Sequence, residues 1–170
     1  MNKACASEGK HLIWNFTKFV ETTIERPAHV VWPYLFREKV DVWTRTPYTT
    51  VAGEAGKVGE IYEMSFEGGT FAFETIAATP EKRLVLKILY QQGAESERKL
   101  SGYDFFALHE VAGRTTVTFN QAVELLVDLK EDLSSRTETH GKFLTDIFQD
   151  LKRMVEGSPL GESPATWWRS

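Results

Sequence analysis

The sequence predicts an α+β domain in which a curved antiparallel sheet wraps around one long C-terminal helix. Three observations predict this class. Between residues 46 and 125, apolar and polar residues largely alternate, which is the period of a half-buried strand. Short turns separate these segments, and short turns join antiparallel neighbours. Residues 132–156 instead space their apolar positions three and four apart, as an amphipathic helix does.

Each element follows in order along the chain. Residues 16–25 mix β-branched and aromatic side chains and predict the first strand. Pro27 suits the first position of a helix, where its missing N–H costs nothing. Residues 28–43 then predict a helix followed by a second short one. Pro33 lies inside the first helix, so we expect a kink or an early end there.

The remaining predicted strands are separated by turn residues. Gly53, Gly56 and Gly59 form a spaced glycine turn that superficially resembles a phosphate cradle. This turn lies between two strands and opens no helix, so we expect it to need positive φ angles and to bind no nucleotide. The predicted strands cover residues 46–53, 59–66, 70–78, 83–90, 100–111 and 114–125.

Length and composition bound the function. A chain of 170 residues with 42% hydrophobic content suits one domain with a sizeable core. The net charge of −4 argues against a general nucleic-acid binder. The single Cys5 has no disulfide partner, and the histidines show no metal-binding spacing, so we expect no metal and no cofactor. A reducing, cytoplasmic compartment is the expectation.

The ends of the chain are expected to lie outside the domain. The start of the sequence has no apolar stretch of the signal-peptide kind, and no apolar run approaches the ~20 residues of a membrane span. We expect residues 1–15 to be an N-terminal extension, residues 16–157 to be a single domain, and residues 158–170 to be a C-terminal tail.

Several stretches follow one another in a characteristic order: TTIERPAHVVWPYL, the late Trp43, AGEAGKVGEIYEMSFEGG, TPEKRL, GRTT and LKRMVEG. Their order resembles the START/polyketide-cyclase (SRPBCC) superfamily, which includes the birch-pollen allergen family. The resemblance covers roughly residues 16–157, whereas Pro33 and the tail depart from the usual pattern. It implies the helix-grip fold: a seven-stranded curved antiparallel sheet around a long C-terminal helix, with two short helices after the first strand.

The resemblance also implies a class of function. Members of this superfamily enclose a cavity between sheet and helix, and they take lipids, sterols, plant hormones or aromatic polyketides. We therefore expect a small apolar, lipid-like or polyketide-like ligand, held by a carrier or by a polyketide cyclase/dehydrase-like enzyme. The alternative is a non-catalytic interaction protein of the same fold, such as a chaperone-ATPase activator or a stress-response module. The fold alone does not choose among these.

The resemblance places alternate residues of the strands, and one helix face, in the cavity. The alternative is that these side chains simply fill a packed core. Gln121 is expected among them as a polar group that orients a ligand carbonyl or makes a structural hydrogen bond. The candidate ligand-binding residues are Tyr62, Met64, Phe66, Phe71, Phe73, Leu86, Ile88, Tyr90, Phe106, Phe119, Gln121, Phe143, Leu144 and Ile147.

The register of the sixth strand has two solutions. Asp104, Phe106 and Leu108 form one inward set. Tyr103, Phe105 and His109 form the other, because a one-residue slip swaps the two faces of a strand.

Two residues are candidates for acid–base chemistry. His140 falls in step with the apolar stripe of the last helix, where burial readily moves its pKa. Asp104 would face an apolar space and would need a partner or stay protonated. We take them as the candidate catalytic pair. The alternatives are a hydrogen-bonded core or cavity-mouth histidine and an ordinary surface aspartate.

Trp167 and Trp168 are the most unusual feature of the tail. Two exposed indoles are costly, and three arrangements would cover them: folding back over the cavity, docking on a second subunit, or contact with a membrane surface. The alternative is a disordered tail. The expected partner is a small apolar ligand, and the expected assembly is a monomer or a homodimer.

Overall fold

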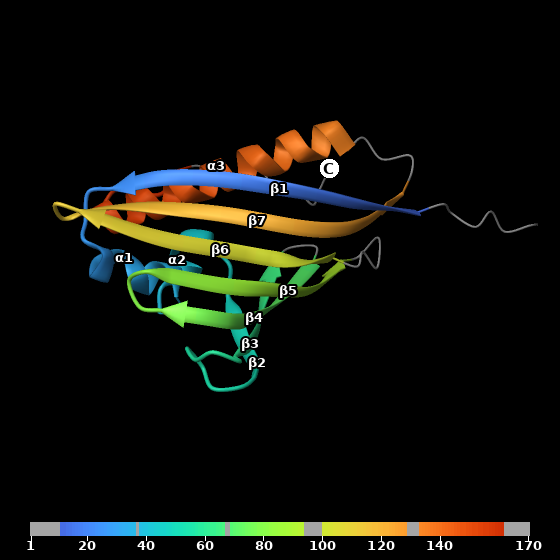
Figure 1. The fold of residues 1–170 in the computed structure, drawn as a ribbon, viewed down its shortest axis with the longest axis horizontal. Coiled ribbons are helices and arrows are strands. Elements are labelled where there is room, and N and C mark those ends of the chain that lie inside the picture. Colours follow the sequence, from blue (N-terminus) through green and yellow to red (C-terminus); the bar gives the residue numbers. More distant parts are fainter. Residues whose placement is uncertain (1–10, 37, 67–68, 94–99, 129–132, 162–170) are drawn as a thin grey trace, which may run out of the picture.

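The computed structural model describes residues 11–36, 38–66, 69–93, 100–128 and 133–161. Seven strands form one antiparallel sheet in the order β1-β7-β6-β5-β4-β3-β2, with the helix α3 lying along it (Figure 1). The predicted fold class is confirmed. The elements are β1 His11–Ile24, α1 Ala28–Leu35, α2 Val40–Thr44, β2 Tyr48–Ala52, β3 Ile61–Phe66, β4 Gly69–Thr79, β5 Arg83–Gly93, β6 Leu100–Val111, β7 Arg114–Asp128 and α3 Leu133–Glu156.

The first strand is longer than the sequence predicted. β1 begins at His11, inside the stretch that we expected to be an N-terminal extension. It pairs with β7 along its whole length, from His11 opposite Asp128 to Ile24 opposite Thr115. The prediction placed the start of the strand too late, although Ile13 and Trp14 are residue types that favour strands.

The two short helices differ from the prediction by one detail. Pro27 is the residue before α1 rather than its first residue, and its carbonyl accepts hydrogen bonds from the N–H groups of Val30 and Val31. α1 ends at Leu35, soon after Pro33, as expected from the proline. The indole Nε1–H of Trp43 donates to the carbonyl of Tyr34 at 2.6 Å, which ties α2 to the end of α1.

The glycine turn before β3 has the predicted backbone. Gly53, Gly56 and Gly59 have φ angles of 79°, 75° and 88°. The carboxylate of the fully buried Glu60 accepts hydrogen bonds from the Gly56 N–H and the Thr50 hydroxyl, both at 2.7 Å. This carboxylate holds the turn against β2.

Of the two inward sets predicted for β6, the structure has the one that contains Asp104, Phe106 and Leu108. Asp104, Phe106 and Leu108 are 7%, 9% and 8% exposed, whereas Tyr103 and Phe105 are 41% and 42% exposed. The pairing of β6 with β7 places Phe106 opposite Phe119 and Asp104 opposite Gln121. The inward side of both strands is thereby fixed.

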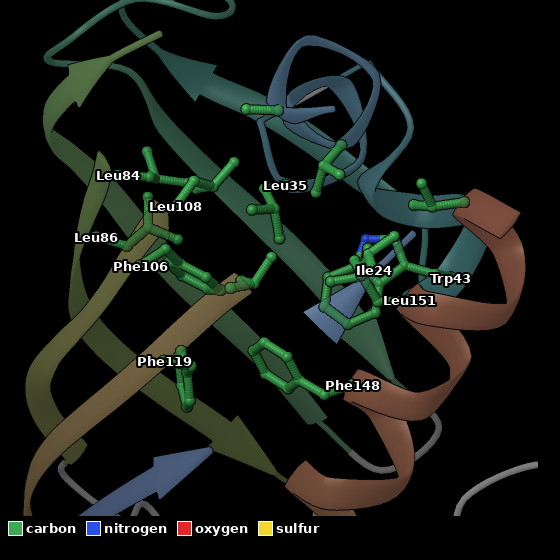
Figure 2. Close-up of a cluster of buried hydrophobic side chains, with 14 of the residues drawn as sticks. Ile24, Leu35, Trp43, Leu84, Leu86, Phe106, Leu108, Phe119, Phe148 and Leu151 are labelled. Atoms are coloured by element: carbon green, nitrogen blue, oxygen red, sulfur yellow. The ribbon is translucent and has the colours of Figure 1, made fainter. Parts of the chain in front are cut away.

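The core lies between this inward side and α3. Figure 2 shows Phe106 and Phe119 extending from the sheet toward Phe148 on α3. The ring centroids of Phe119 and Phe148 are 5.1 Å apart, and those of Phe106 and Phe119 are 4.9 Å apart. α3 ends before Gly157, which has a φ of 81°, and the N–H of Ser158 closes the last turn on the Arg153 carbonyl.

Asp150 is a buried carboxylate that joins three parts of the chain. It is 1% exposed on α3 and accepts hydrogen bonds from Arg45 Nη2 at 2.6 Å and from Arg153 Nη1 at 3.1 Å. The N–H of Gly161 donates to the same carboxylate at 2.9 Å, and the Gly161 carbonyl accepts from Arg45. Asp150 therefore fixes the end of α2 and the segment after α3 to the helix itself.

We expect Asp150→Ala to lower the free energy of unfolding by about 3 kcal/mol, because it removes the partner of a partly buried guanidinium. Urea denaturation would measure the loss. The matched control is Glu25→Gln, since Glu25 and its partner Arg114 form a largely exposed ion pair. That variant should change stability by at most about 0.5 kcal/mol. Equal losses in the two variants would contradict the role given to Asp150.

A candidate ligand cavity with one polar end

A cavity of about 150 Å³ lies between the sheet, α2 and α3. An apolar void of this order holds a benzene-sized molecule in other proteins. Most of the predicted ligand-binding residues line it: Tyr62, Met64, Phe71, Phe73, Leu86, Ile88, Phe106, Phe119, Gln121, Phe143, Leu144 and Ile147, together with Asp104 and His140. The side chains of Phe66 and Tyr90 lie outside the described part of the structure.

Sequence reasoning missed one wall of the cavity. Leu35, Val40, Trp43 and Thr44 line it from α1 and α2, and Phe16 lines it from β1. Strand alternation carries no information about α1 and α2, which accounts for four of these omissions, whereas Phe16 lies on a strand and was overlooked. Trp43 was the available signal, because a helix as short as α2 cannot bury so large an apolar side chain by itself and must pack it against other elements.

Stacked rings form the wall built by β3 and β4. The rings of Tyr62 and Phe73 stack with centroids 5.5 Å apart, and those of Phe71 and Phe73 stack at 6.3 Å. Tyr62 and Phe73 lie opposite each other in the β3–β4 pairing, which brings their side chains to one face. The hairpin thus presents a flat aromatic surface to the cavity.

Three polar side chains meet at one end of this apolar space. Gln121 Nε2 donates to Asp104 Oδ1 at 2.9 Å, and His140 Nε2 lies 2.6 Å from Gln121 Oε1. An amide oxygen only accepts, so His140 Nε2 carries the proton in this arrangement. All three residues are buried. The rings of Phe16 and His140 meet edge to face, with their centroids 5.5 Å apart.

Burial moves the two titratable groups in opposite directions. It raises the pKa of Asp104 from 3.8 to about 7, partly opposed by the hydrogen bond from Gln121. It lowers the pKa of His140 from 6.5 to about 4, assisted by the positive charge of Lys18. At neutral pH, His140 is therefore uncharged and Asp104 is divided between acid and carboxylate. Such opposed pairs are typical of functional sites.

Several other candidates stand apart from the cavity. His29 and His109 are exposed. Among the described residues no group of three His, Cys, Asp or Glu side chains gathers as metal ligands would, and no helix is long and apolar enough to cross a membrane. Cys5, Trp167 and Trp168 lie outside the described residues.

Comparison with known proteins supports the fold. No family model matches the chain, and no curated protein matches it. Solved structures do match. Ginseng major latex-like protein 151 from Panax ginseng is 18% identical, with a TM-score of 0.62 over 84% of this chain and 96% of that one. Ara h 8.0201 is 12% identical, with a TM-score of 0.64 over 85% of this chain and all of that one.

A third match comes from a biosynthetic locus. DynU16, a protein of the dynemicin biosynthetic locus, is 18% identical with a TM-score of 0.64, over 86% of this chain and 50% of that one. Identities this low show a shared fold and nothing more specific. The chain has the helix-grip fold of the latex-like and Ara h 8 proteins.

The raised pKa of Asp104 predicts a pH-dependent stability. The folded protein holds this proton where the unfolded chain has released it, so the stabilisation is complete below pH 3.8 and is lost as the pH rises toward 7. Relative to the wild-type protein, Asp104→Asn should therefore gain up to about 4 kcal/mol between pH 4 and pH 8. Urea denaturation of both proteins at pH 4, 6 and 8 would measure this difference.

His140→Gln provides the control of opposite sign. The unfolded chain takes up the His140 proton below pH 6.5, whereas the folded protein takes it up only near pH 4. The wild-type protein should lose stability relative to His140→Gln as the pH falls through this range. Stability profiles that run parallel in all three proteins would contradict the assigned burial of both groups.

Proposed function

We propose that this protein binds a small aromatic or otherwise apolar molecule in the cavity between sheet and α3. One observation supports the proposal: about 150 Å³ of the interior is unfilled, and the side chains that line this space are apolar except for a few polar ones. This is the usual form of a small-molecule site, in which apolar walls supply affinity and a few polar groups fix orientation. Carrying or sequestering such a molecule needs no further machinery.

The rival is an interaction protein whose core is filled. A filled core would leave no room among Phe73, Phe106 and Phe119, whereas about 150 Å³ stays open beside them. The cost of leaving apolar side chains without packing partners favours a function for the space. Ligand binding is therefore the better-supported reading of this site.

Dye binding would test the proposal. N-phenyl-1-naphthylamine is uncharged and fluoresces in apolar surroundings, and we expect it to bind the wild-type protein with a rise in emission. Phe73→Trp adds a larger ring to the cavity wall and should weaken binding at least tenfold. Phe105→Trp is the matched control on the opposite face of the sheet and should bind as the wild type does. Because the dye has three aromatic rings and a cavity of about 150 Å³ suits a benzene-sized molecule, benzene binding should be measured in parallel by NMR; a folded wild-type protein that binds neither molecule would contradict the proposal.

A second candidate function is catalysis on the bound molecule. The hydrogen-bonded chain from Asp104 through Gln121 to His140 favours it, since it places an acid with a pKa of about 7 and a neutral imidazole at the cavity. Cyclisation or dehydration of a polyketide-like chain needs a water-poor space that holds the chain folded, with one group to move a proton. Asp104 would donate or accept that proton, and His140 would orient Gln121.

Turnover of a poly-β-ketone thioester analogue, followed by chromatography of the products, would test the enzymatic candidate. If the protein is an enzyme, Asp104→Asn and His140→Gln should each reduce turnover at least about 100-fold, a typical loss for an acid–base group. Dye binding should stay within a few-fold of the wild type in both variants. Equal turnover by the wild type and both variants would exclude these residues from the chemistry.

A further inference from the structure

Some of the polar side chains that line the cavity are joined to one another by hydrogen bonds. Of the polar residues that line it, Asp104, Gln121 and His140 form the connected chain described above. The hydroxyl of Thr44 is already used, because it donates to the Val40 carbonyl at 2.7 Å. The phenol of Tyr62 also belongs to the lining, on β3, so a bound molecule meets apolar walls, this phenol, and the connected chain of Asp104, Gln121 and His140.

Asp104 offers an unused hydrogen-bonding atom in this connected chain. Its Oδ1 accepts from Gln121 Nε2, while its Oδ2 makes no hydrogen bond to any other residue that the structure describes. The side chain is more than nine-tenths buried and lines the cavity. Oδ2 is not among the fully buried atoms that lack a partner, so water can reach it, and a ligand group that pairs with it replaces that water and gains the usual net value of one hydrogen bond.

The described side chains that line the cavity around Asp104 include no lysine or arginine that could bind an anion. Lys18 acts on His140 from β1, but its ammonium group lies against α3 at Gly141 rather than in the lining. The other neighbours of Asp104 are uncharged: Leu86 lies opposite on β5, and Gln121 lies opposite on β7. An anionic ligand would lose its water and find no counter-charge.

We infer that the cavity selects uncharged aromatic molecules that carry a hydroxyl or carbonyl group, and that it excludes carboxylates of the same size. The inference rests on the proposed binding function and adds the ligand's chemical class. A hydroxyl or carbonyl group of the ligand forms a hydrogen bond with Asp104 Oδ2. A ligand carboxylate instead loses its water and becomes a buried charge without a counter-ion, which is unfavourable. Discrimination against carboxylates should increase with pH, because Asp104 itself becomes an anion.

Three probes with one ring system isolate the polar group: naphthalene, 2-naphthol and 2-naphthoate. Displacement of N-phenyl-1-naphthylamine at pH 6 and pH 8.5 gives their affinities. We expect 2-naphthol to bind about fivefold tighter than naphthalene, the usual gain from one hydrogen bond. We expect 2-naphthoate to bind at least about 100-fold more weakly than 2-naphthol at pH 8.5. Its affinity should fall about tenfold or more between the two pH values.

Two variants assign the effect to Asp104. Asp104→Asn keeps the acceptor for Gln121 and cannot ionise, so the affinity of 2-naphthoate should no longer depend on pH in this range. Lys18→Gln is the control for the nearest cation and should leave the preference for 2-naphthol unchanged. A smaller preference for 2-naphthol in Asp104→Asn at pH 8.5 is also expected.

The outcomes separate this inference from the function on which it rests. Binding of 2-naphthoate within threefold of 2-naphthol, or the same pH profile in Asp104→Asn, would overturn the inference and leave ligand binding intact. A change of the preference in Lys18→Gln would overturn it as well, by showing that the ligand meets a cation. If none of the three probes displaces the dye, the proposed function fails and the inference falls with it.

Discussion

The pairing of β6 with β7 is the constraint on which the rest of the site depends. It sets Phe106 opposite Phe119 and Asp104 opposite Gln121, so one register fixes both the aromatic contact with Phe148 and the polar chain to His140. A slip of one residue would turn Tyr103 and Phe105 inward and carry Asp104 to the outer face. Both the apolar and the polar character of the cavity therefore come from the same backbone hydrogen bonds.

The hydrogen-bonded chain of Asp104, Gln121 and His140 costs free energy because it is buried among apolar side chains. Burial raises the pKa of Asp104 and lowers that of His140, which means that each group is held in an environment that opposes its charged form. Gln121 offsets part of this cost by pairing with both neighbours. An all-apolar cavity end would be more stable. The protein keeps polar atoms where a bound molecule would meet them, and this favours a role in recognition or in proton transfer.

Local sequence signals predicted the ends of an element correctly where turn or loop residues marked both of its ends. β6 was predicted with its observed ends because the polar stretch of residues 94–99 precedes it in the sequence and Ala112 and Gly113 mark the turn that follows it. The start of β1 was placed too late although Ile13 and Trp14 favour strands, and the pairing with β7 shows that the strand already begins at His11. Trp43 and Thr44 were missed as cavity residues because their approach to α3 depends on how two short helices pack.

The inward faces of the strands were expected from the family resemblance. The sequence by itself determined the α+β class and the order of the elements, since both follow from residue periodicity and turn chemistry along the chain. It left open which side of β6 faces inward, because both sides carry aromatic residues. Only the tertiary structure decided that Asp104, Gln121 and His140 meet. They come from three elements, and their contacts depend on distances between strands and helix that no local pattern encodes. The open volume was likewise decided by packing, because it is the small difference between the space enclosed and the side chains that fill it.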